Sequence, residues 1–225
     1  MKKFILLLFA VALSIQDLAQ WRLGPEAGLN LSNIKENIAG NINTNSILPG
    51  ARVGCIFDYE YKNDHFSFQP GVFFSMMGCY SPGSNTYAYG ITNVVPNTTT
   101  SIYYAHIPIN FVYKSDLGPG RIFIGAGPYL AYGVYGTIKT QAYNVGAQSA
   151  PATSENIKFG SDTSSLKALD YGLNVVAGYE LPSGLLFRAG YSYGFANLSN
   201  MSAVKEYNTC IFFSLAWLLG GPGYR

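Results

Sequence analysis

Nine ionisable residues have the side-chain types needed to conduct ions, bind a charged ligand or form buried ion pairs. Each lies in a segment where bulky apolar residues alternate with small or polar ones, on the small or polar side. The nine are Glu26, Arg52, Asp58, Glu60, His106, Lys114, Asp170, Glu180 and Arg188. If these sides face one narrow enclosed space, charges there must pair or cost several kcal/mol each. We therefore expect a structural polar network rather than a conduction path or ligand site, with Arg188 paired to Glu180 or Glu26.

Acid–base or nucleophilic catalysis is poorly supported. The only histidines are His65, expected in a tight turn, and His106, expected in the middle of a strand and hydrogen-bonded inside. A serine nucleophile in a long connection would therefore lack its base. The sequence predicts no enzyme, and it contains no motif for a cofactor or metal.

The three cysteines do not form the even set that a disulfide framework needs. Cys55 is expected opposite about residue 72 of the neighbouring strand, and Cys79 and Cys210 are far from each other in sequence. We interpret all three as small apolar fillers. The chain also contains no basic run or stripe, so nucleic acid is not an expected partner.

Period-two alternation defines the elements that must position the ionisable residues. It is present in eight segments, at 22–32, 51–61, 66–78, 102–114, 121–135, 170–181, 185–195 and 207–219. The connections between them alternate between tight (62–65, 115–120, 182–184) and long (33–50, 79–101, 136–169, 196–206). An even number of strands with alternating short and long connections is typical of an outer-membrane β-barrel.

The sequence thus predicts an all-β fold, an eight-stranded antiparallel up-and-down transmembrane β-barrel. Its apolar exterior would face lipid and its packed lumen would be polar. Residues 20–225 would form the barrel domain. Residues 1–19 read as a cleaved signal peptide, with Lys2 and Lys3, an apolar run and a cleavage site after Ala19. The protein is expected in the outer membrane, in contact with its lipid and with the barrel-assembly machinery.

Aromatic residues on the apolar side gather near both ends of the segments, as lipid interfaces require. Those near the tight connections are Tyr59, Tyr61, Phe66, Phe68, Phe111, Tyr113, Tyr179, Phe187 and Trp217. Those near the long connections are Tyr80, Tyr103, Tyr132, Tyr171, Tyr193, Phe195 and Tyr207. We interpret these two groups as the aromatic girdles of a membrane-spanning wall.

Prolines and glycines inside the segments need an explanation, because proline cannot donate to a sheet ladder. Pro25, Pro70 and Pro128 each adjoin a glycine, which indicates β-bulges that bend the strands. The glycines of "GAGPYLAYG" (125–133) are expected to keep the lumen from overfilling around Tyr129 and Tyr135.

Six ordered motifs carry a resemblance to a known family. They are "GPEAGLNLS" (24–32), "FQPGVFFSMMG" (68–78), "YYAHIPINFVYK" (103–114), "GAGPYLAYG" (125–133), "DYGLNVVAGYEL" (170–181) and "RAGYSYGFANLS" (188–199). The chain resembles the PorT-type outer-membrane β-barrel family of Gram-negative bacteria. His106 stands where that family often has an acidic residue. The ending "WLLGGPGYR" also departs from it, and indicates an assembly signal at 217–219.

The resemblance implies the fold and the cellular location of the protein in more detail than its activity. A non-enzymatic barrel with a structural, surface-interaction or secretion-supporting role is the leading interpretation, with an envelope or secretion partner bound through the long connections. The connection at 137–168, with "AQSAPATSEN", would bind that partner or remain a solvated loop. Two alternatives stay open: a narrow solute pore, and a soluble exported lipocalin-like barrel whose apolar side encloses a ligand.

Overall fold

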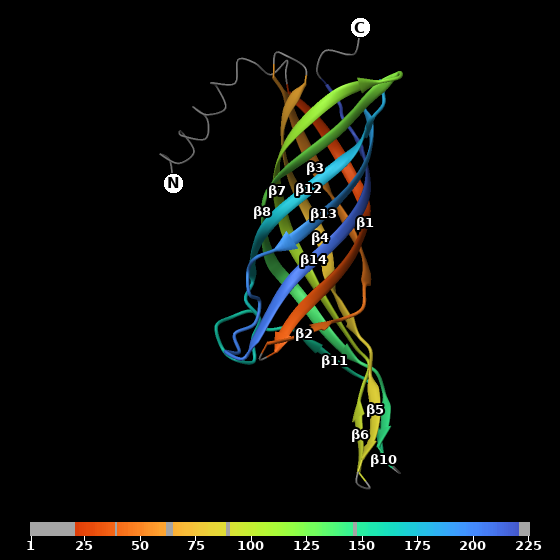
Figure 1. Cartoon of the computed structure of the whole chain (residues 1–225), viewed down its shortest axis with the longest axis vertical. Helices are drawn as coiled ribbons and strands as arrows, with labels where there is room; N and C mark the ends of the chain where they lie inside the picture. Colours follow the sequence, from red (N-terminus) through yellow and green to blue (C-terminus); the bar gives the residue numbers. More distant parts are fainter. Residues whose placement is uncertain (1–20, 39, 62–64, 89–90, 146–147, 221–225) are drawn as a thin grey trace.

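The chain folds into a closed ring of antiparallel strands in a computed structural model (Figure 1). The structure describes residues 21–38, 40–61, 65–88, 91–145 and 148–220. The predicted signal peptide and Ala19 lie outside these ranges. The ring strands are β1 (Trp21–Ile38), β3 (Leu48–Glu60), β4 (Phe66–Ser81), β7 (Thr98–Leu117), β8 (Gly120–Thr140), β12 (Leu169–Glu180), β13 (Leu185–Gly194) and β14 (Val204–Trp217).

The ring closes because the first strand pairs with the last. β1 and β14 run antiparallel with Leu29 opposite Phe213. Just beyond the end of β14, Leu219 exchanges two backbone hydrogen bonds with Leu23 of β1. Every other ring strand pairs with its neighbours along the chain. The eight-stranded up-and-down barrel predicted from the alternation is therefore confirmed.

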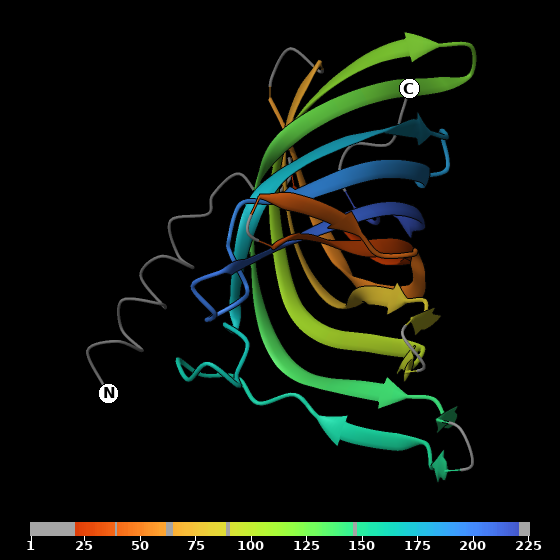
Figure 2. The ribbon, with the colours of Figure 1, turned by 60° about the horizontal axis from the view of Figure 1, so that its bottom comes forward.

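The two ends of the barrel differ in their connections. At the short-turn end, tight turns follow β7 and β12, as the sequence predicted, and the connection after β3 contains residues 62–64, which lie outside the described ranges. At the long-loop end, β2 (Asn41–Thr44) folds back on β1, and β11 (Thr153–Asn156) pairs with β8 (Figure 2). Among the residues described, no helix is long and apolar enough to cross a membrane.

Two hairpins extend beyond the long-loop end. One is formed by β5 (Ser84–Ala88) and β6 (Ile91–Val95), the other by β9 (Tyr143–Val145) and β10 (Gln148–Ala150). β6 contacts β9, and together the hairpins form a projection that we call the finger (Figure 1). The ring strands that carry it are longer than predicted. β8 has 21 residues, which is about 70 Å at the usual rise per residue, and an apolar membrane band is only about 25 Å tall.

Side chains alternate between the two faces of the wall along every ring strand. In β12, Leu173 and Val175 are exposed on the outside, while Asn174 and Val176 are buried inside. The apolar exterior is as predicted, but the lumen is not uniformly polar. A cluster of buried apolar residues, including Ile56 and Phe212, occupies it between the polar side chains.

Inward glycines make room for inward aromatic rings. Phe73, the bulky residue that breaks the alternation of β4, points inward, and a Cβ at Gly54 would lie 2.6 Å from its ring. A Cβ at Gly178 would lie 2.5 Å from Phe123. The same relation holds between Gly172 and Tyr129 and between Gly190 and Phe212. Glycine is needed at these positions because the lumen of an eight-stranded barrel barely holds its own side chains.

The prediction that the prolines mark bulges is wrong. Ile56 pairs with Gly71 and Tyr59 with Phe68, so the register is the same on both sides of Pro70. A proline facing outward removes one backbone donor from the ladder but need not add a residue to the strand.

The irregularity of the sheet lies elsewhere. Tyr103 pairs with Tyr135 but Tyr104 with Gly133, so Val134 is an extra residue without a partner. This insertion reverses the alternation, and both Val134 and Tyr135 are exposed. Tyr135 therefore points outward, and the prediction that it fills the lumen is wrong; Tyr129 does point inward.

The cysteines follow the prediction. Cys55 lies opposite Val72, and Cys55, Cys79 and Cys210 are all free thiols.

Substituting an inward glycine tests the packing of the lumen. Gly54→Val adds a branched side chain against the Phe73 ring and the Val72 carbonyl. We expect the free energy of unfolding in lipid vesicles to fall by about 1–3 kcal/mol, as overpacked cores show. Gly160→Ala is the control, since its Cβ would lie 3.5 Å from Ser165 Oγ, an ordinary contact. Equal urea unfolding of the two variants would contradict the steric argument.

Candidate functional site

Six charged side chains meet inside the lumen at the short-turn end. The cations are Arg22, Lys114 and Arg121, and the anions are Asp58, Glu60 and Glu180. They come from the ends of five ring strands, β1, β3, β7, β8 and β12, which all begin or finish at this end. We call this set the lower ion cluster.

Lys114 lies at the centre of the lower ion cluster. Its Nζ is 2.8 Å from Asp58 Oδ2, 2.8 Å from Glu60 Oε1 and 3.2 Å from Glu180 Oε2. The three donors of the ammonium thus face three carboxylates. The Lys114 side chain is fully buried, so its charge is compensated by these partners and not by water.

Two arginines supply the remaining positive charges of the lower ion cluster. Arg22 Nε donates to Asp58 at 3.2 Å, and its terminal nitrogens also bond Glu60 and Glu180. Arg121 donates to Glu180 Oε1 at 3.2 Å and also bonds Glu60. Three cations therefore oppose three anions, and the cluster is neutral as a whole.

A second group of charges lies one layer further in. Glu26 bonds Arg188, and its Oε1 is 3.5 Å from Arg52 Nε. Arg188 also donates to Gln69 Oε1 at 3.2 Å, and Gln69 donates to Asp58 Oδ1 at 2.9 Å. Gln69 therefore joins this layer to the lower ion cluster. Of the two partners expected for Arg188, Glu26 is the one found, because Glu180 belongs to the lower ion cluster.

The Arg52 guanidinium lies between two aromatic rings. Its central carbon is 4.1 Å from the ring centre of Phe73 and 4.1 Å from that of Phe212. A cation held over aromatic faces is stabilised by their electron density, most strongly away from water. This contact holds Arg52, one of the two cations that pair with Glu26, among the apolar residues of the lumen.

His106 does not behave as the sequence predicted. Among the described residues, neither ring nitrogen has a hydrogen-bond partner. Its neighbours in the sheet are Phe73 and Ala131, which offer no side-chain acceptor, and its ring contacts the edge of Tyr129 at 4.9 Å. The expectation of a hydrogen-bonded histidine is therefore wrong, and no base–nucleophile pair forms around it.

Asp170 lies nearest the long-loop end and is held by neutral groups. Tyr129 donates its hydroxyl to Asp170 Oδ2 at 3.2 Å, and Asn208 donates to the same oxygen at 2.9 Å. No ion pair within the described part of the chain includes Asp170. All nine ionisable residues predicted for the lumen thus lie inside. Eight of them form three layers, of which the lower two are joined through Gln69, and His106 belongs to none.

Sequence reasoning missed two of the cations. Arg22 shares the parity of Glu26 in β1, so alternation alone was enough to find it. Arg121 is the second residue of β8, directly after a tight turn, and only the register shows that it lies opposite Glu180.

The long connection after β8 covers the lumen at the long-loop end. Residues 157–168 pack Ile157, Phe159 and Leu166 on the buried apolar cluster. The backbone of Ile157 bonds Gly136 at 2.8 Å, and that of Lys167 bonds Leu198 at 2.8 Å. We call residues 157–168 the cap. In its described part, this connection contains β9, β10, β11 and the cap, and most of its side chains between 151 and 164 are exposed to solvent.

A cavity of about 390 Å³ lies beneath the cap. Glu36 and Glu206 are directly opposite each other in the β1–β14 ladder, and Glu155 and Lys158 also line this cavity. Among the described residues, no group of acidic, histidine or cysteine side chains is placed to hold a metal.

The outer wall carries the predicted aromatic residues on its outward positions. Each of the sixteen aromatic residues named for the two girdles is exposed or half-buried, and none of them is among the buried residues of the lumen. Tyr179 also holds a turn, donating to the Leu117 carbonyl at 2.7 Å and accepting from the Gly120 amide.

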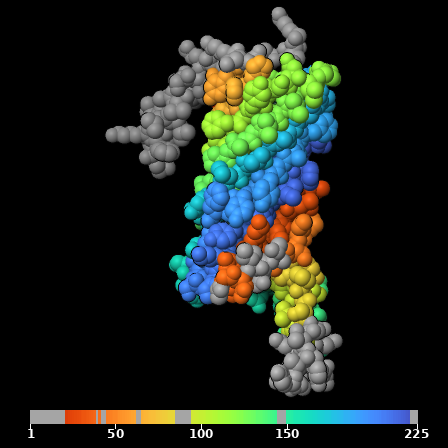
Figure 3. All heavy atoms as spheres, in the orientation of Figure 1, coloured from red at the N-terminus to blue at the C-terminus, as the bar shows by residue number. Residues whose placement is uncertain are grey.

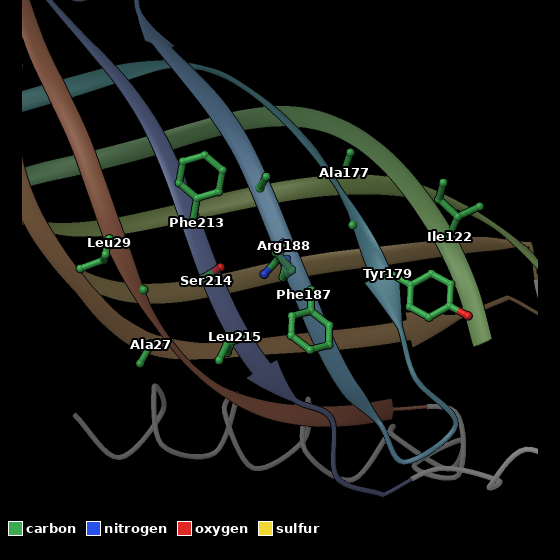
Figure 4. A pocket seen from close by; sticks show the side chains of 13 residues that line it. Ala27, Leu29, Ile122, Ala177, Tyr179, Phe187, Arg188, Phe213, Ser214 and Leu215 are labelled. Carbon is green, nitrogen blue, oxygen red and sulfur yellow. The ribbon is translucent and has the colours of Figure 1, made fainter. Parts of the chain in front are cut away.

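A shallow apolar groove of about 730 Å³ crosses the wall nearer the short-turn end (Figure 4). Its floor has small residues, among them Ala27, Ala177 and Ala189, and it is bordered by Phe187 and Phe213. Side chains of β12, β13 and β14 cover the middle of this side of the molecule (Figure 3).

A comparison with protein families shows which family this chain belongs to. Residues 15–200 match the family model described as the outer membrane protein beta-barrel domain. The chain belongs to this family. An outward apolar face with girdles is what an outer-membrane β-barrel needs, since every backbone group in lipid must be paired within the protein.

Two solved structures are similar to this chain. Neisserial surface protein A is 13% identical, with a TM-score of 0.42 over 88% of this chain and 96% of that one. Ail, the attachment invasion locus protein of Yersinia pestis, in complex with the heparin analogue sucrose octasulfate, is 14% identical, with a TM-score of 0.35 over 88% and 99%. No curated protein matches this outer-membrane barrel.

Removing the central cation of the lower ion cluster tests its role in this barrel. Lys114→Met leaves three carboxylates facing two arginines in a buried site, and breaking buried ion pairs costs about 3–5 kcal/mol. We expect a loss of that size in urea unfolding, partly recovered when Asp58→Asn is added. Lys139→Met, at an exposed lysine, is the control and should change stability by less than about 0.5 kcal/mol. An unchanged Lys114→Met barrel would show that the cluster does not stabilise the fold.

Proposed function

We propose that this outer-membrane barrel is a non-conducting, non-enzymatic anchor that presents the finger to a protein partner. The observation that carries the proposal is the closed lumen. Its charges are bonded to one another at the short-turn end, and the cap covers it at the long-loop end. A lumen filled in this way supports the wall and leaves no described path for solute or substrate.

The finger is the part of the molecule that projects furthest from the wall. Asn97 joins its two hairpins at their base: its Oδ1 accepts from the Gly83 amide at 2.7 Å, and its side-chain amide donates to Gln141 at 3.0 Å. The ladder between β7 and β8 continues up to this point. The base of the finger is therefore continuous with the barrel wall.

The composition of the finger supports protein binding. Residues 79–101 and 140–154 contain no charged side chain and are rich in Tyr, Asn, Ser and Thr. Exposed strand edges are usually protected by charges, especially lysine, against pairing with other chains. Tyr, Ser and Asn are also the residues that binding loops use for contact area and adaptable hydrogen bonds. An uncharged hairpin edge is suited to accept an extended segment of another protein.

The proposal also covers the branch of the family, the route of export and the mode of insertion. We assign the chain to the PorT-type branch, in a Gram-negative bacterium, exported by a leader that ends at Ala19 and inserted by the barrel-assembly machinery. Support comes from the six motifs, which fall on β1, β4, β7, β8, β12 and β13 in order. In that branch the partner would belong to a secretion apparatus.

The alternatives have less support. A lipocalin-like barrel needs its apolar side inside, but here Leu173, Val175 and Phe213 face outward. A narrow pore needs an open lumen, and the ion pairs of Lys114 lie across it.

Bilayer recording separates the anchor from the pore. Purified barrel inserted into a planar bilayer is expected to give no resolved conductance, because the lower ion cluster and the cap block both ends of the lumen. Reproducible single-channel steps from the folded, heat-modifiable protein would contradict the proposal and favour the pore.

Crosslinking in intact cells tests the finger. A photoreactive residue at Val95 is expected to give discrete adducts with another protein. The matched control is Val175, in the wall, because the two valines are 50% and 49% exposed. Adducts at neither site, or equally at both, would overturn the proposed role of the finger. A secretion component attached at Val95 would support the PorT-type role.

A further inference from the structure

A second groove, of about 680 Å³, opens on the outside of the wall at the long-loop end. Its floor is apolar and aromatic, and its edge is polar. The floor includes Tyr132, Leu169, Tyr171 and Phe195, and the edge includes Lys167 and Asn197. The groove thus combines apolar surface with the cation of Lys167.

The floor of this groove is part of the aromatic girdle. Tyr132 on β8, Tyr171 on β12 and Phe195 after β13 are each about half exposed on the outer face. The Phe195 amide donates to the Tyr171 carbonyl at 2.8 Å, so the sheet continues across the floor. Aromatic belts lie where acyl chains meet lipid headgroups. The groove is therefore at headgroup depth.

One lysine, Lys167, lines the groove, and a second, Lys205, lies on the neighbouring strand β14. Lys167 is exposed, and its amide bonds the Leu198 carbonyl at 2.8 Å. Lys205 is exposed on β14 and precedes Glu206, whose amide donates to Asn197 Oδ1 at 2.9 Å. That bond joins the strand of Lys205 to the edge of the groove.

A third lysine lies along the same face. Lys35 Nζ is 5.2 Å from the ring centre of Tyr193, which is 5.7 Å from that of Phe195 in the floor. Tyr193 therefore lies between Lys35 of β1 and the Phe195 ring in the floor of the groove.

These three lysines are not compensated by acidic neighbours. No ion pair among the described residues includes Lys35, Lys167 or Lys205. Glu36 and Glu206, the acidic residues of the adjoining strands, line the cavity under the cap instead of the outer face. Asp162, in the cap, is exposed but also forms no ion pair with these lysines. The outer face is consequently positive at headgroup depth.

We propose that this groove binds one anionic lipid, with an acyl chain on the aromatic floor and its phosphate beside Lys167 and Lys205. Lys35 attracts the same headgroup from the far side. The inference rests on the proposed membrane-spanning anchor, and names a specific lipid contact for it. Lysine contributes about 1 kcal/mol of attraction to anionic lipid, which is about fivefold in affinity per lysine.

Quenching of a tryptophan placed in the floor measures lipid binding at this groove. The natural Trp21 and Trp217 lie at the short-turn end, so Phe195→Trp adds a separate reporter, and the signal of the unsubstituted protein is subtracted. Tyr171→Trp is a second reporter if Phe195→Trp does not fold. The probes are brominated phosphatidylglycerol and brominated phosphatidylcholine, each diluted into phosphatidylcholine vesicles holding the refolded full chain.

Brominated phosphatidylglycerol is expected to quench the reporter with at least fivefold higher affinity than brominated phosphatidylcholine. Lys167→Gln and Lys205→Gln should each reduce that preference about fivefold, while Lys139→Gln, outside the groove, should leave it unchanged. Equal quenching by both lipids, or a preference that survives the double lysine substitution, would overturn the site. Reversal by inorganic phosphate alone would also overturn it, because the site would then bind free anions and not lipid.

Gel mobility separates this proposal from the membrane anchor. A protein that stays compact until boiled but shows no lipid preference refutes the lipid site alone. A protein without heat-modifiable mobility refutes the membrane-spanning barrel, and the lipid site with it.

Discussion

Closure of the backbone ladder between β1 and β14 is the constraint on which the rest of the structure depends. In lipid no water is present to bond free amides and carbonyls, so a sheet that spans the membrane cannot keep an open edge. Eight strands are few for a closed ring, and the space inside is correspondingly narrow. The glycines opposite Phe73 and Phe123 follow from that lack of space. So does the position of the Arg52 guanidinium between two rings, since a cation there has no room for its own water.

The narrow lumen also decides how its charges are arranged. Between the short-turn end and Asp170, the inward faces carry five cations (Arg22, Arg52, Lys114, Arg121, Arg188) and five anions (Glu26, Asp58, Glu60, Asp170, Glu180). Most meet a partner of opposite sign directly, and Gln69 bonds the two lower layers together. Buried pairs of this kind are weak evidence for net stability, but breaking one is costly. Their arrangement fixes the relative positions of strands that are far apart in sequence.

This rigid wall separates two ends with different chemistry. Short turns and interlocked charges occupy one end, whereas the other carries the cap, the uncharged finger and the lysines around the outer groove. Each feature at the long-loop end lies on a strand that continues past the membrane band or directly follows one. The length of β7 and β8 therefore links the anchor to the surface that it presents.

The sequence by itself determined the strands and their faces, because a period of two is a local property of each segment. It placed all eight ring strands, nine of the eleven inward ionisable residues discussed above, and even the Cys55–Val72 register of one hairpin. The sequence did not determine which charged residues pair when they are far apart along the chain. Arg22 bonds Glu180 across 158 positions, and Glu26 rather than Glu180 receives Arg188, because those choices depend on how the ring closes. One extra residue in β8, Val134, makes Tyr135 point outward. In the cap, the Phe159 ring packs against the inward glycine Gly133, where a Cβ would lie 2.7 Å from it. Such details follow from register and packing, which only the closed tertiary structure sets.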